Sequence, residues 1–428
     1  MGLPLALTFA ALTAGLASVV SVRVRKARRA RDALTPAEAS EVPAAADPAF
    51  VDRLAEVTGM TFTSDNAVEV IRNSDGIIRR LFADIASARR SVTLQVYFAR
   101  PGSVARELAA IVAERASTGV AVRILFDAIG CRGFDRTYFD DLRRNGVAVH
   151  RMRPIRWYAP HRITYRAHSR IAVIDGVVGY TGGFGIANAW RHDPDSADGW
   201  QDISVRFTGS TAHHAQVAFA DAWRETAGEE LQGPVFFPAQ PLVEANHQAA
   251  FLRTAPCRGS MAAKPLVEWA LSSARRSIYA TTGYFAPDDN LMALLANAVR
   301  RGVDVRILTT GEATDLRIVR WAGRSTYGRL LRQGVRIYEY LPRMLHAKTM
   351  VVDGILSSVG AINFDRRSLE VNDETTLVVR DETIGSRLDA MFHRDLLDSR
   401  EIEIAEFERR GWVERAYEEL AAPIREQL

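Results

Sequence analysis

Short apolar runs alternate with amphipathic segments over most of the chain. Residues 92–98 (VTLQVYF) form a β-rich run, and residues 103–118 place their apolar side chains on one helical face before Gly119. Residues 120–126 form another apolar strand. Strand–helix–strand units with short connections predict an α/β fold, in which helices cover both faces of a mixed sheet.

This pattern occurs twice along the chain. The segment SARRSVTLQVYF, which starts at Ser87, is repeated as SARRSIYATTGYF from Ser273. Likewise, VAVRIL at 120–125 is repeated as VDVRIL at 303–308. A repeat length of roughly 180 residues is that of a duplicated domain rather than of a solenoid. We therefore predict two related α/β domains.

A long uncharged stretch precedes the repeated part. Residues 3–22 (LPLALTFAALTAGLASVVSV) can cross a hydrocarbon core of about 30 Å at 1.5 Å per residue. Six basic residues follow between Arg23 and Arg31, which favours a cytoplasmic position for everything after them. A cleaved signal peptide is the alternative because AGLAS at 14–18 resembles a cleavage site, but signal peptides carry positive charge before the apolar run. We predict one retained transmembrane helix and a single-pass protein of the cell membrane with cytoplasmic catalytic domains.

Composition divides the chain into five parts. We expect an anchor with its basic flank at 1–31, an Ala/Pro/Glu-rich linker at 32–50, a first domain at 51–245, a second domain at 246–400 and a helical tail at 401–428. The acidic charges of the tail disfavour membrane binding, so we expect the tail to pack on the second domain.

Charge and residue usage exclude several classes of function. The formal net charge is +4, but the six basic residues before position 32 account for it, and the rest has more acidic than basic residues. A nucleic-acid enzyme usually spreads positive charge over its catalytic body, so we expect no nucleic-acid partner. The two cysteines and the scattered histidines predict no metal site. No lysine follows a glycine, which excludes a P-loop.

One repeated block carries the candidate chemistry. It reads HSRIAVID at 168–175 with GGFG at 182–185, and HAKTMVVD at 346–353 with GAIN at 360–363. In a strand, residues two positions apart face the same side, so each copy presents an imidazole beside a cation. The pairs are His168 with Arg170, and His346 with Lys348.

Glycines follow each block, at Gly182, Gly183 and Gly360, and allow backbone N–H groups to approach an anion. Two blocks placed face to face would surround one phosphorus with two imidazoles. In a phosphodiester exchange, one neutral histidine attacks phosphorus while the other, protonated, donates to the leaving alkoxide. Cations and amides stabilise charge on the equatorial oxygens. With a usual imidazole pKa of about 6.5, both roles can be filled near neutral pH without a metal or cofactor.

The duplicated H-x-K-x4-D pattern, with its glycine and asparagine tail, resembles the phospholipase D superfamily. The stretch 346–374 (HAKTMVVDGILSSVGAINFDRRSLEVNDE) and YFAP at 284–287 are similar to bacterial cardiolipin synthases. The similarity runs from about residue 60 to 400. It implies two α/β domains related by pseudo-twofold symmetry, an active site between them and a covalent phosphohistidine intermediate.

The resemblance also implies roles for individual residues. His168 corresponds to the nucleophile, and His346 to the general acid that later acts as base. The implied supporting groups bind phosphate (Arg170, Lys348, Asn363), orient a catalytic histidine (Glu374, Asp202) or orient their own motif strand (Asp175, Asp353). Three positions depart from the family pattern: Arg170 replaces a lysine, Gly185 an asparagine and Ala361 a small hydroxyl residue.

We therefore predict a membrane-anchored phosphatidyltransferase that makes cardiolipin from phosphatidylglycerol. A phospholipase D, in which water resolves the covalent adduct, is the first alternative, because the choice depends on how well the site excludes water. A nuclease and a non-catalytic lipid-binding protein are further alternatives. The arginine- and aromatic-rich segment 151–166 is either a solvated loop or a rim that contacts anionic headgroups.

Overall fold

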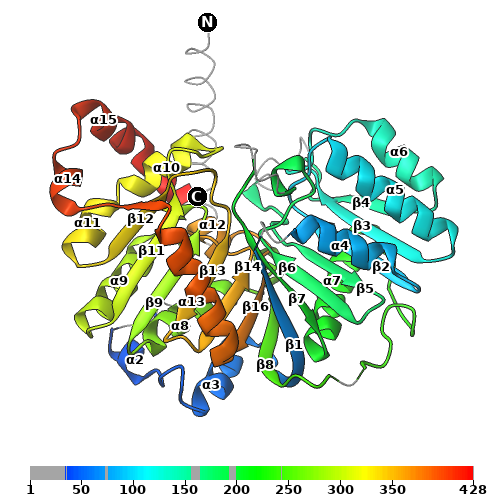
Figure 1. The fold of residues 1–428 in the computed structure, drawn as a ribbon, viewed down its shortest axis with the longest axis horizontal. Coiled ribbons are helices and arrows are strands. Elements are labelled where there is room, and N and C mark those ends of the chain that lie inside the picture. The colour runs from blue at the N-terminus through cyan, green and yellow to red at the C-terminus, as the bar shows by residue number, and fades with distance from the viewer. Residues whose placement is uncertain are drawn as a thin grey trace, which may run out of the picture.

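The computed structural model describes residues 34, 36–72, 76–155, 164–191, 199–241 and 243–427. These residues form a continuous 15-stranded mixed sheet with helices on both faces (Figure 1). The strand order is β17-β12-β11-β9-β13-β14-β16-β8-β1-β7-β6-β5-β2-β3-β4. The predicted mixed α/β fold in two repeated halves is confirmed.

The first half supplies one side of this sheet. In sheet order its strands are β1 (Thr63–Arg72), β7 (Ile203–Thr208), β6 (Val178–Gly182), β5 (Ile171–Ile174), β2 (Ser91–Val96), β3 (Ala121–Asp127) and β4 (Ala148–Met152). Strands β2, β3 and β4 are parallel, and the other neighbours are antiparallel. Every residue of β2 and β5 is buried, as expected for strands covered on both faces.

The second half repeats this arrangement. Its strands are β8 (His247–Arg253), β16 (Thr375–Arg380), β14 (Leu356–Gly360), β13 (Lys348–Val352), β9 (Ser277–Thr282), β11 (Asp304–Thr310), β12 (Arg336–Tyr340) and the edge strand β17 (Ser399–Glu401). Strands β9, β11 and β12 are parallel. The short strands β10 (Phe285–Ala286) and β15 (Phe364–Asp365) form a separate parallel pair.

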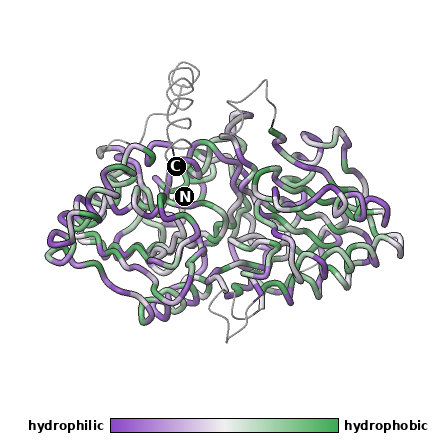
Figure 2. The backbone as a smooth tube through the Cα atoms, turned by 90° about the horizontal axis from the view of Figure 1, so that it is seen from above, coloured by the Kyte–Doolittle hydropathy of each residue, from purple (hydrophilic) through white to green (hydrophobic). Residues whose placement is uncertain are grey.

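The two halves meet where β1 pairs with β8 in antiparallel register, with Asn66 opposite His247. The Asn66 amide donates to the backbone oxygen of His247 at 3.1 Å, which fixes this junction. Outward from the junction, both halves have the same order of strands, so a pseudo-twofold axis relates them. Viewed from above, they lie side by side along the long axis of the molecule (Figure 2).

Helices on one face of the sheet give the two halves a common core. These are α7 (Ser210–Ala227) and α13 (Glu382–Leu396). Phe219 of α7 and Leu388 of α13 belong to one apolar cluster with Val205 and Leu377. The halves therefore fold against each other as a unit, and burial of this shared apolar surface holds them together.

Other helices cover the opposite face of each half. In the first half they are α4 (Ile77–Ala86), α5 (Ser103–Ser117) and α6 (Arg136–Arg144), and in the second half α8 (Ala263–Ser273), α9 (Asp289–Arg300) and α11 (Tyr327–Arg332). The helix predicted at 103–118 corresponds to α5.

The prediction of a linker at 32–50 is wrong for most of the residues that the structure describes in this stretch. Residues in this stretch form α2 (Pro36–Glu41) and the start of α3 (Ala49–Thr58), and Val42 and Phe50 are buried in the core of the second half. The guanidinium of Arg380 donates to the backbone oxygen of Ala45 at 3.0 Å. The segment is ordered because its few apolar side chains dock on α8, which an aperiodic composition does not reveal.

The C-terminal residues pack on the second half. Helices α14 (Ile404–Glu408) and α15 (Trp412–Ala421) lie against α11 and α10 (Arg317–Arg324) (Figure 1). The predicted transmembrane stretch, 3–22, lies outside the described residues. Among the helices that the structure does describe, none has both the length and the apolar character needed to span a bilayer.

Candidate active site

Both motif histidines lie where a strand of one half meets the other half. The residue before His168 forms a parallel bridge with Asp373, and the residue before His346 forms the equivalent bridge with Gln201. The backbone N–H of His346 donates to the oxygen of Gln201 at 2.7 Å. Only 7% of His168 and 4% of His346 is exposed. The fold thus brings the two repeated blocks to one buried interface.

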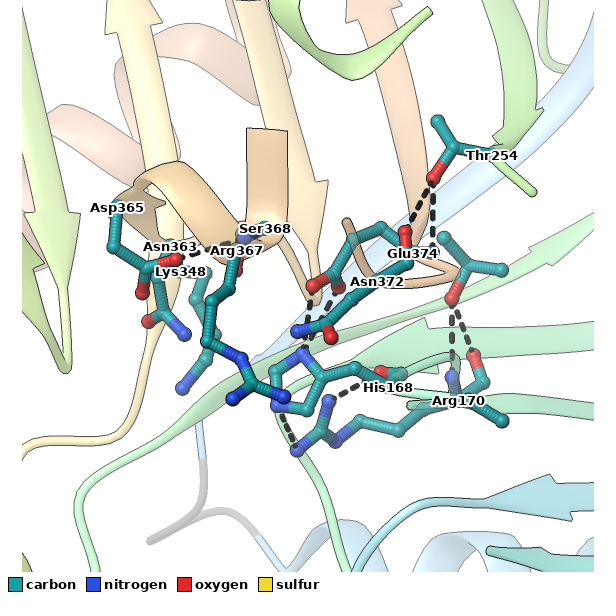
Figure 3. A network of polar contacts seen from close by, with 12 residues as sticks. His168, Arg170, Thr254, Lys348, Asn363, Asp365, Arg367, Ser368, Asn372 and Glu374 are labelled. Carbon is teal, nitrogen blue, oxygen red and sulfur yellow. Dashed lines mark hydrogen bonds and ion pairs between the residues drawn. The ribbon is translucent and has the colours of Figure 1, made fainter. Parts of the chain in front are cut away.

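A carboxylate from the opposite half holds each imidazole. Nδ1 of His168 lies 2.9 Å from Oε1 and 3.0 Å from Oε2 of Glu374 (Figure 3). Nδ1 of His346 lies 2.9 Å from Oδ2 of Asp202. A neutral imidazole that donates its Nδ1–H to a carboxylate carries its lone pair on Nε2. These contacts therefore assign Nε2 as the basic or nucleophilic atom of each ring.

A buried cation lies beside each histidine. Arg170 donates from Nη1 to the backbone oxygen of His168 at 2.7 Å, and its Nη2 lies 3.2 Å from Nε2 of the same ring (Figure 3). Its Nε donates to the carbonyl of Phe184 at 3.1 Å. Lys348 donates from Nζ to the backbone oxygen of His346. Each half thus holds a positive charge against its own imidazole.

Burial and these charges shift several pKa values. Burial, and next the positive charge of Arg170, lowers the pKa of His168 well below its usual value. Burial and then Lys348 do the same to the pKa of His346. Burial also lowers the pKa of Lys348 to about 7 and raises that of Asp202 to about 6. Lys348 and His346 both contribute to lowering the pKa of His168, so the two halves form one electrostatic unit.

Aromatic rings enclose the two imidazoles. The Tyr97 ring lies edge-on to His168 at 4.7 Å between centroids, and Tyr284 lies 6.3 Å from His346. Trp200 lies 5.0 Å from the His346 ring. Sequence reasoning assigned none of these side chains to the site. A signal for the tyrosines was present, because each is the second-last residue of the segment that is repeated from Ser87 and from Ser273.

Arg367 is a further cation that the sequence analysis missed. It lies on α12 (Arg366–Glu370), and its guanidinium points toward His168 and Lys348 (Figure 3). It donates from Nη2 to the backbone oxygen of Thr164 at 2.8 Å, and its charge contributes to lowering the pKa of His168. Three cations, Arg170, Lys348 and Arg367, thus lie near the rings and can bind an anionic substrate.

The two halves differ in how they supply polar groups. Asn363 is buried beside Lys348, and its Oδ1 lies 3.4 Å from the backbone nitrogen of Tyr284 (Figure 3). At the equivalent position of the first half, Gly185 has no side chain, and a Cβ there would lie 2.8 Å from the Trp190 ring. Trp190 therefore fills the space that an asparagine would need, and its Nε1 donates to Asp202 at 2.8 Å.

The glycines predicted to bind phosphate lie at tightly packed positions. Gly182 and Gly360 are strand residues paired with Ser204 and Thr376, and a Cβ at either would clash with the neighbouring strand. The N–H of Gly183 is directed to a backbone oxygen, and a Cβ there would lie 2.2 Å from the Asp202 carboxylate. These glycines permit close packing of strands and of Asp202, and their role in binding phosphate stays a prediction.

The motif aspartates lie away from the imidazoles and contact the backbone at the start of a neighbouring strand. Asp175 accepts hydrogen bonds from the backbone nitrogens of residues 89–91, and Asp353 from those of residues 275–277. Both have positive φ, 54° and 56°, in the turn after their strands. A strand of four or five residues lies between each aspartate and the histidine at the start of the same block. They position the motif strands, as the resemblance implied.

No group of three or more His, Cys, Asp or Glu side chains with metal-binding geometry occurs among the described residues.

Solved structures share the fold. Phosphatidylserine synthase of Haemophilus influenzae aligns with a TM-score of 0.69 and 12% identity, over 88% of this chain and 99% of that one. Polyphosphate kinase of Porphyromonas gingivalis aligns with a TM-score of 0.54 and 13% identity, over 90% of this chain and 55% of that one. At these identities the likeness concerns the fold alone.

This duplicated fold, with a histidine–cation pair from each half at one interface, is that of a phospholipase D-like protein. The sequence model of the family described as "Cardiolipin synthase, PLD-like domain" matches residues 81–197 and 268–396, one match in each half. The major cardiolipin synthase of Bacillus subtilis is 32% identical over 373 residues, which cover 85% of this chain and 76% of that protein. Cardiolipin synthase A of Serratia proteamaculans is 30% identical over 368 residues, with the same two coverages. The chain belongs to the cardiolipin synthase family.

Proposed function

We propose that this protein is a phosphatidyltransferase that forms cardiolipin and glycerol from two molecules of phosphatidylglycerol. Membership of the family supports this activity. The observation that carries the proposed mechanism is the crossed arrangement of His168 with Glu374 and of His346 with Asp202. It supplies two oriented imidazoles, one from each half, at a site rich in positive charge.

In the first step, Nε2 of His168 attacks the phosphorus of one phosphatidylglycerol. An N–P bond forms while the P–O bond to the headgroup glycerol breaks. His346, protonated on Nε2, gives its proton to the leaving glycerol oxygen. The phosphate anion attracts the donors of Arg170 away from Nε2 of His168, which frees the lone pair. The same anion offsets the positive charges that lower the pKa of His346, so this imidazole can be protonated in the complex.

In the second step, a hydroxyl group of another phosphatidylglycerol resolves the adduct. Nε2 of His346, now neutral, accepts the hydroxyl proton as the oxygen attacks phosphorus. The N–P bond breaks, and cardiolipin leaves while His168 returns to its neutral form. Arg170, Lys348 and Asn363 hold the phosphoryl oxygens in both steps, and Arg170 and Lys348 stabilise the charge that builds up on them.

Limited exposure of the site favours transfer over hydrolysis. The catalytic imidazoles and both orienting carboxylates are buried, and aromatic rings flank the histidines. Exclusion of water protects a reactive phosphohistidine from hydrolysis until a second lipid hydroxyl arrives.

We place the enzyme at the cell membrane, held by one span at 3–22 with the catalytic halves in the cytoplasm. The uncharged length of this stretch and the basic residues after it support that topology. An anchor raises the effective concentration of two lipid substrates at the site. Cardiolipin synthesis by intact inverted vesicles, but not by right-side-out vesicles, would support the cytoplasmic orientation, and the reverse would contradict it.

Product analysis tests the reaction. The purified full chain is incubated with phosphatidylglycerol labelled in its phosphate, and lipid products and free glycerol are measured together. Equal amounts of cardiolipin and glycerol are expected. Phosphatidic acid as the only lipid product would identify a hydrolase. Labelled phosphohistidine trapped during turnover should disappear in His168→Ala. If it persists there and disappears in His346→Ala, the roles of the histidines are reversed.

A further inference from the structure

A cavity lined largely by charged side chains lies in the second half, and neither catalytic histidine is part of its lining. It has a volume of about 600 Å³ and lies between α10 and the C-terminal helices α14 and α15 (Figure 1). Its lining includes a set of arginines: Arg317, Arg320, Arg324, Arg400, Arg409 and Arg410. Ligand sites typically have volumes of about 300–1,000 Å³, so this cavity can hold a small polar group.

Positive charge exceeds negative charge at the floor of this arginine cavity. Glu339 is fully buried and accepts from Arg324 at 2.6 Å, from Arg320 at 2.9 Å and from Arg400 at 3.4 Å. Glu418 is also buried and pairs with Arg324 at 2.9 Å and Arg410 at 2.7 Å. Four guanidinium groups therefore share two carboxylates. The remaining acidic lining residues are exposed, where water screens their charge.

Arg320 has a buried donor without a partner, and Arg317 has a charge that no acidic side chain of the described residues neutralises. The side chain of Arg320 is 13% exposed, and its Nε is buried without a hydrogen-bond partner. Buried donors are normally satisfied, so this atom indicates an acceptor that the chain itself does not provide. Arg317, at the start of α10, is exposed to solvent and takes part in none of the ion pairs found among the described residues. An anion in the cavity would satisfy both.

The surroundings of the cavity favour an anion carried by a lipid. Leu316 and Ile318 flank Arg317, and they are 46% and 40% exposed. Trp412 and Val413 precede the lining residue Glu414, and Trp412 is 80% exposed. Tryptophan side chains are enriched at the interface between lipid headgroups and acyl chains, and arginine pairs with phosphate oxygens in a bidentate manner. Exposed apolar side chains next to the arginines of the cavity thus match the two parts of a phospholipid.

We propose that this arginine cavity binds the phosphate headgroup of an anionic phospholipid, at a site separate from the catalytic histidines. Trp412 and its apolar neighbours lie at the membrane interface and contact the acyl region of the same lipid. The proposal rests on the proposed function only in taking phosphatidylglycerol as the ligand. Asp315 lies in the chain between the lining residues Thr314 and Arg317. It accepts a hydrogen bond of 2.7 Å from the hydroxyl of Tyr284, whose ring lies near His346, so the arginine cavity is close to the catalytic site.

Equilibrium binding to a chain without turnover tests the proposal. The detergent-purified full chain with His168→Ala is titrated with labelled short-chain phosphatidylglycerol, and the number of bound lipids is counted. We expect two sites. Adding Arg317→Gln and Arg320→Gln should weaken one site about tenfold or more, since each cation near an anionic lipid contributes measurably to binding. Arg143→Gln with Arg144→Gln, exposed arginines on α6, is the matched control and should leave both sites intact.

Additional measurements distinguish loss of lipid binding from loss of the fold and identify the kind of ligand. Because Arg320 contacts buried Glu339, Arg317→Gln alone is also measured, and it should weaken the same site without loss of fold. Inorganic phosphate, added as a competitor, tests whether the ligand is a free anion. The lipid assignment is wrong if phosphate displaces the labelled lipid as well as unlabelled phosphatidylglycerol does and if Trp412→Ser leaves lipid binding unchanged. Unchanged binding in both arginine variants overturns the site itself. If the His168→Ala chain binds two lipids but the unaltered chain makes no cardiolipin, only the proposed function is contradicted.

Discussion

His168 and Glu374 lie in different halves of the chain, yet Nδ1 of the imidazole is 2.9 Å from the carboxylate oxygen Oε1. His346 and Asp202 repeat this relationship with the halves exchanged. Neither half therefore contains a complete histidine–carboxylate pair. Because the shared core of α7 and α13 fixes how the halves meet, packing far from the rings determines the orientation of both imidazoles.

The first prediction concerns Glu374 and Asp202, the carboxylates that hold a histidine of the opposite half. Glu374→Gln and Asp202→Asn keep the shape of each side chain but remove the negative charge that fixes the tautomer and stabilises an imidazolium. Each change should lower kcat for cardiolipin formation about 10²–10⁴-fold, with a smaller effect on KM. Glu229→Gln, which alters a carboxylate paired with Arg123 outside the site, serves as control. Nearly normal kcat in either site variant would show that the carboxylates do not assist the histidines.

The second prediction concerns Arg170, where the resemblance to phospholipase D proteins implies a lysine. Arg170→Lys removes the donors to the Phe184 carbonyl and to Nε2 of His168. A lysine ammonium cannot reproduce this fork, so we expect kcat/KM to fall roughly tenfold or more although the charge is kept. Gly185→Asn should not restore activity, since its Cβ would contact Trp190. An active Arg170→Lys/Gly185→Asn variant would disprove this account of the asymmetry.

The pH profile of kcat/KM reports the pKa values of the free enzyme. Burial lowers the pKa of Lys348 to about 7, so this lysine is charged below that pH and becomes neutral above it. Loss of the charge weakens binding of the anionic substrate, so kcat/KM should decrease as the pH rises through 7. Burial raises the pKa of Asp202 to about 6, so its protonation on the acid side removes the carboxylate that holds His346. The profile should therefore have its maximum between these values.

Lys348→Arg supplies the control for the alkaline limb, because an arginine keeps its charge throughout this range. The variant should lose the decrease above pH 7, whatever its absolute rate. For the unaltered enzyme, a kcat/KM that stays constant up to about pH 8.5 would exclude titration of Lys348.

Much of the fold and of the reacting pairs could be predicted because the chain contains the information twice. The repeat from Ser87 and Ser273 predicted two equivalent halves, and the block at His168 and His346 predicted the imidazole–cation pairs. The pairing of each histidine with a particular carboxylate could not be predicted from residue patterns. It depends on contacts between residues far apart in the chain, and those follow from packing of the two halves.

Three other features lack a local signal. The segment around Val42 and Phe50 has a linker-like composition, and tertiary packing on α8 rather than helix propensity makes it ordered. Gly183 illustrates the second case: a glycine that admits a phosphate and one that admits the Asp202 carboxylate look the same in a sequence. Arg367 escaped notice because nothing distinguishes it from Arg366 until α12 directs one toward the site.

These two adjacent arginines provide the last prediction. Arg367 points toward His168, whereas Arg366 pairs with Glu370 at 3.0 Å. Arg367→Gln should lower kcat/KM roughly tenfold, because it removes a cation that can bind the phosphate or the headgroup of the incoming lipid. It should also raise the pKa of His168, since the charge of Arg367 contributes to lowering it. Arg366→Gln removes the same charge one residue away and should leave kcat/KM nearly unchanged. Steady-state kinetics on phosphatidylglycerol, with the His168 pKa followed by NMR, distinguish the two variants. Equal losses in both would mean that general electrostatic attraction, and not the position of Arg367, is responsible.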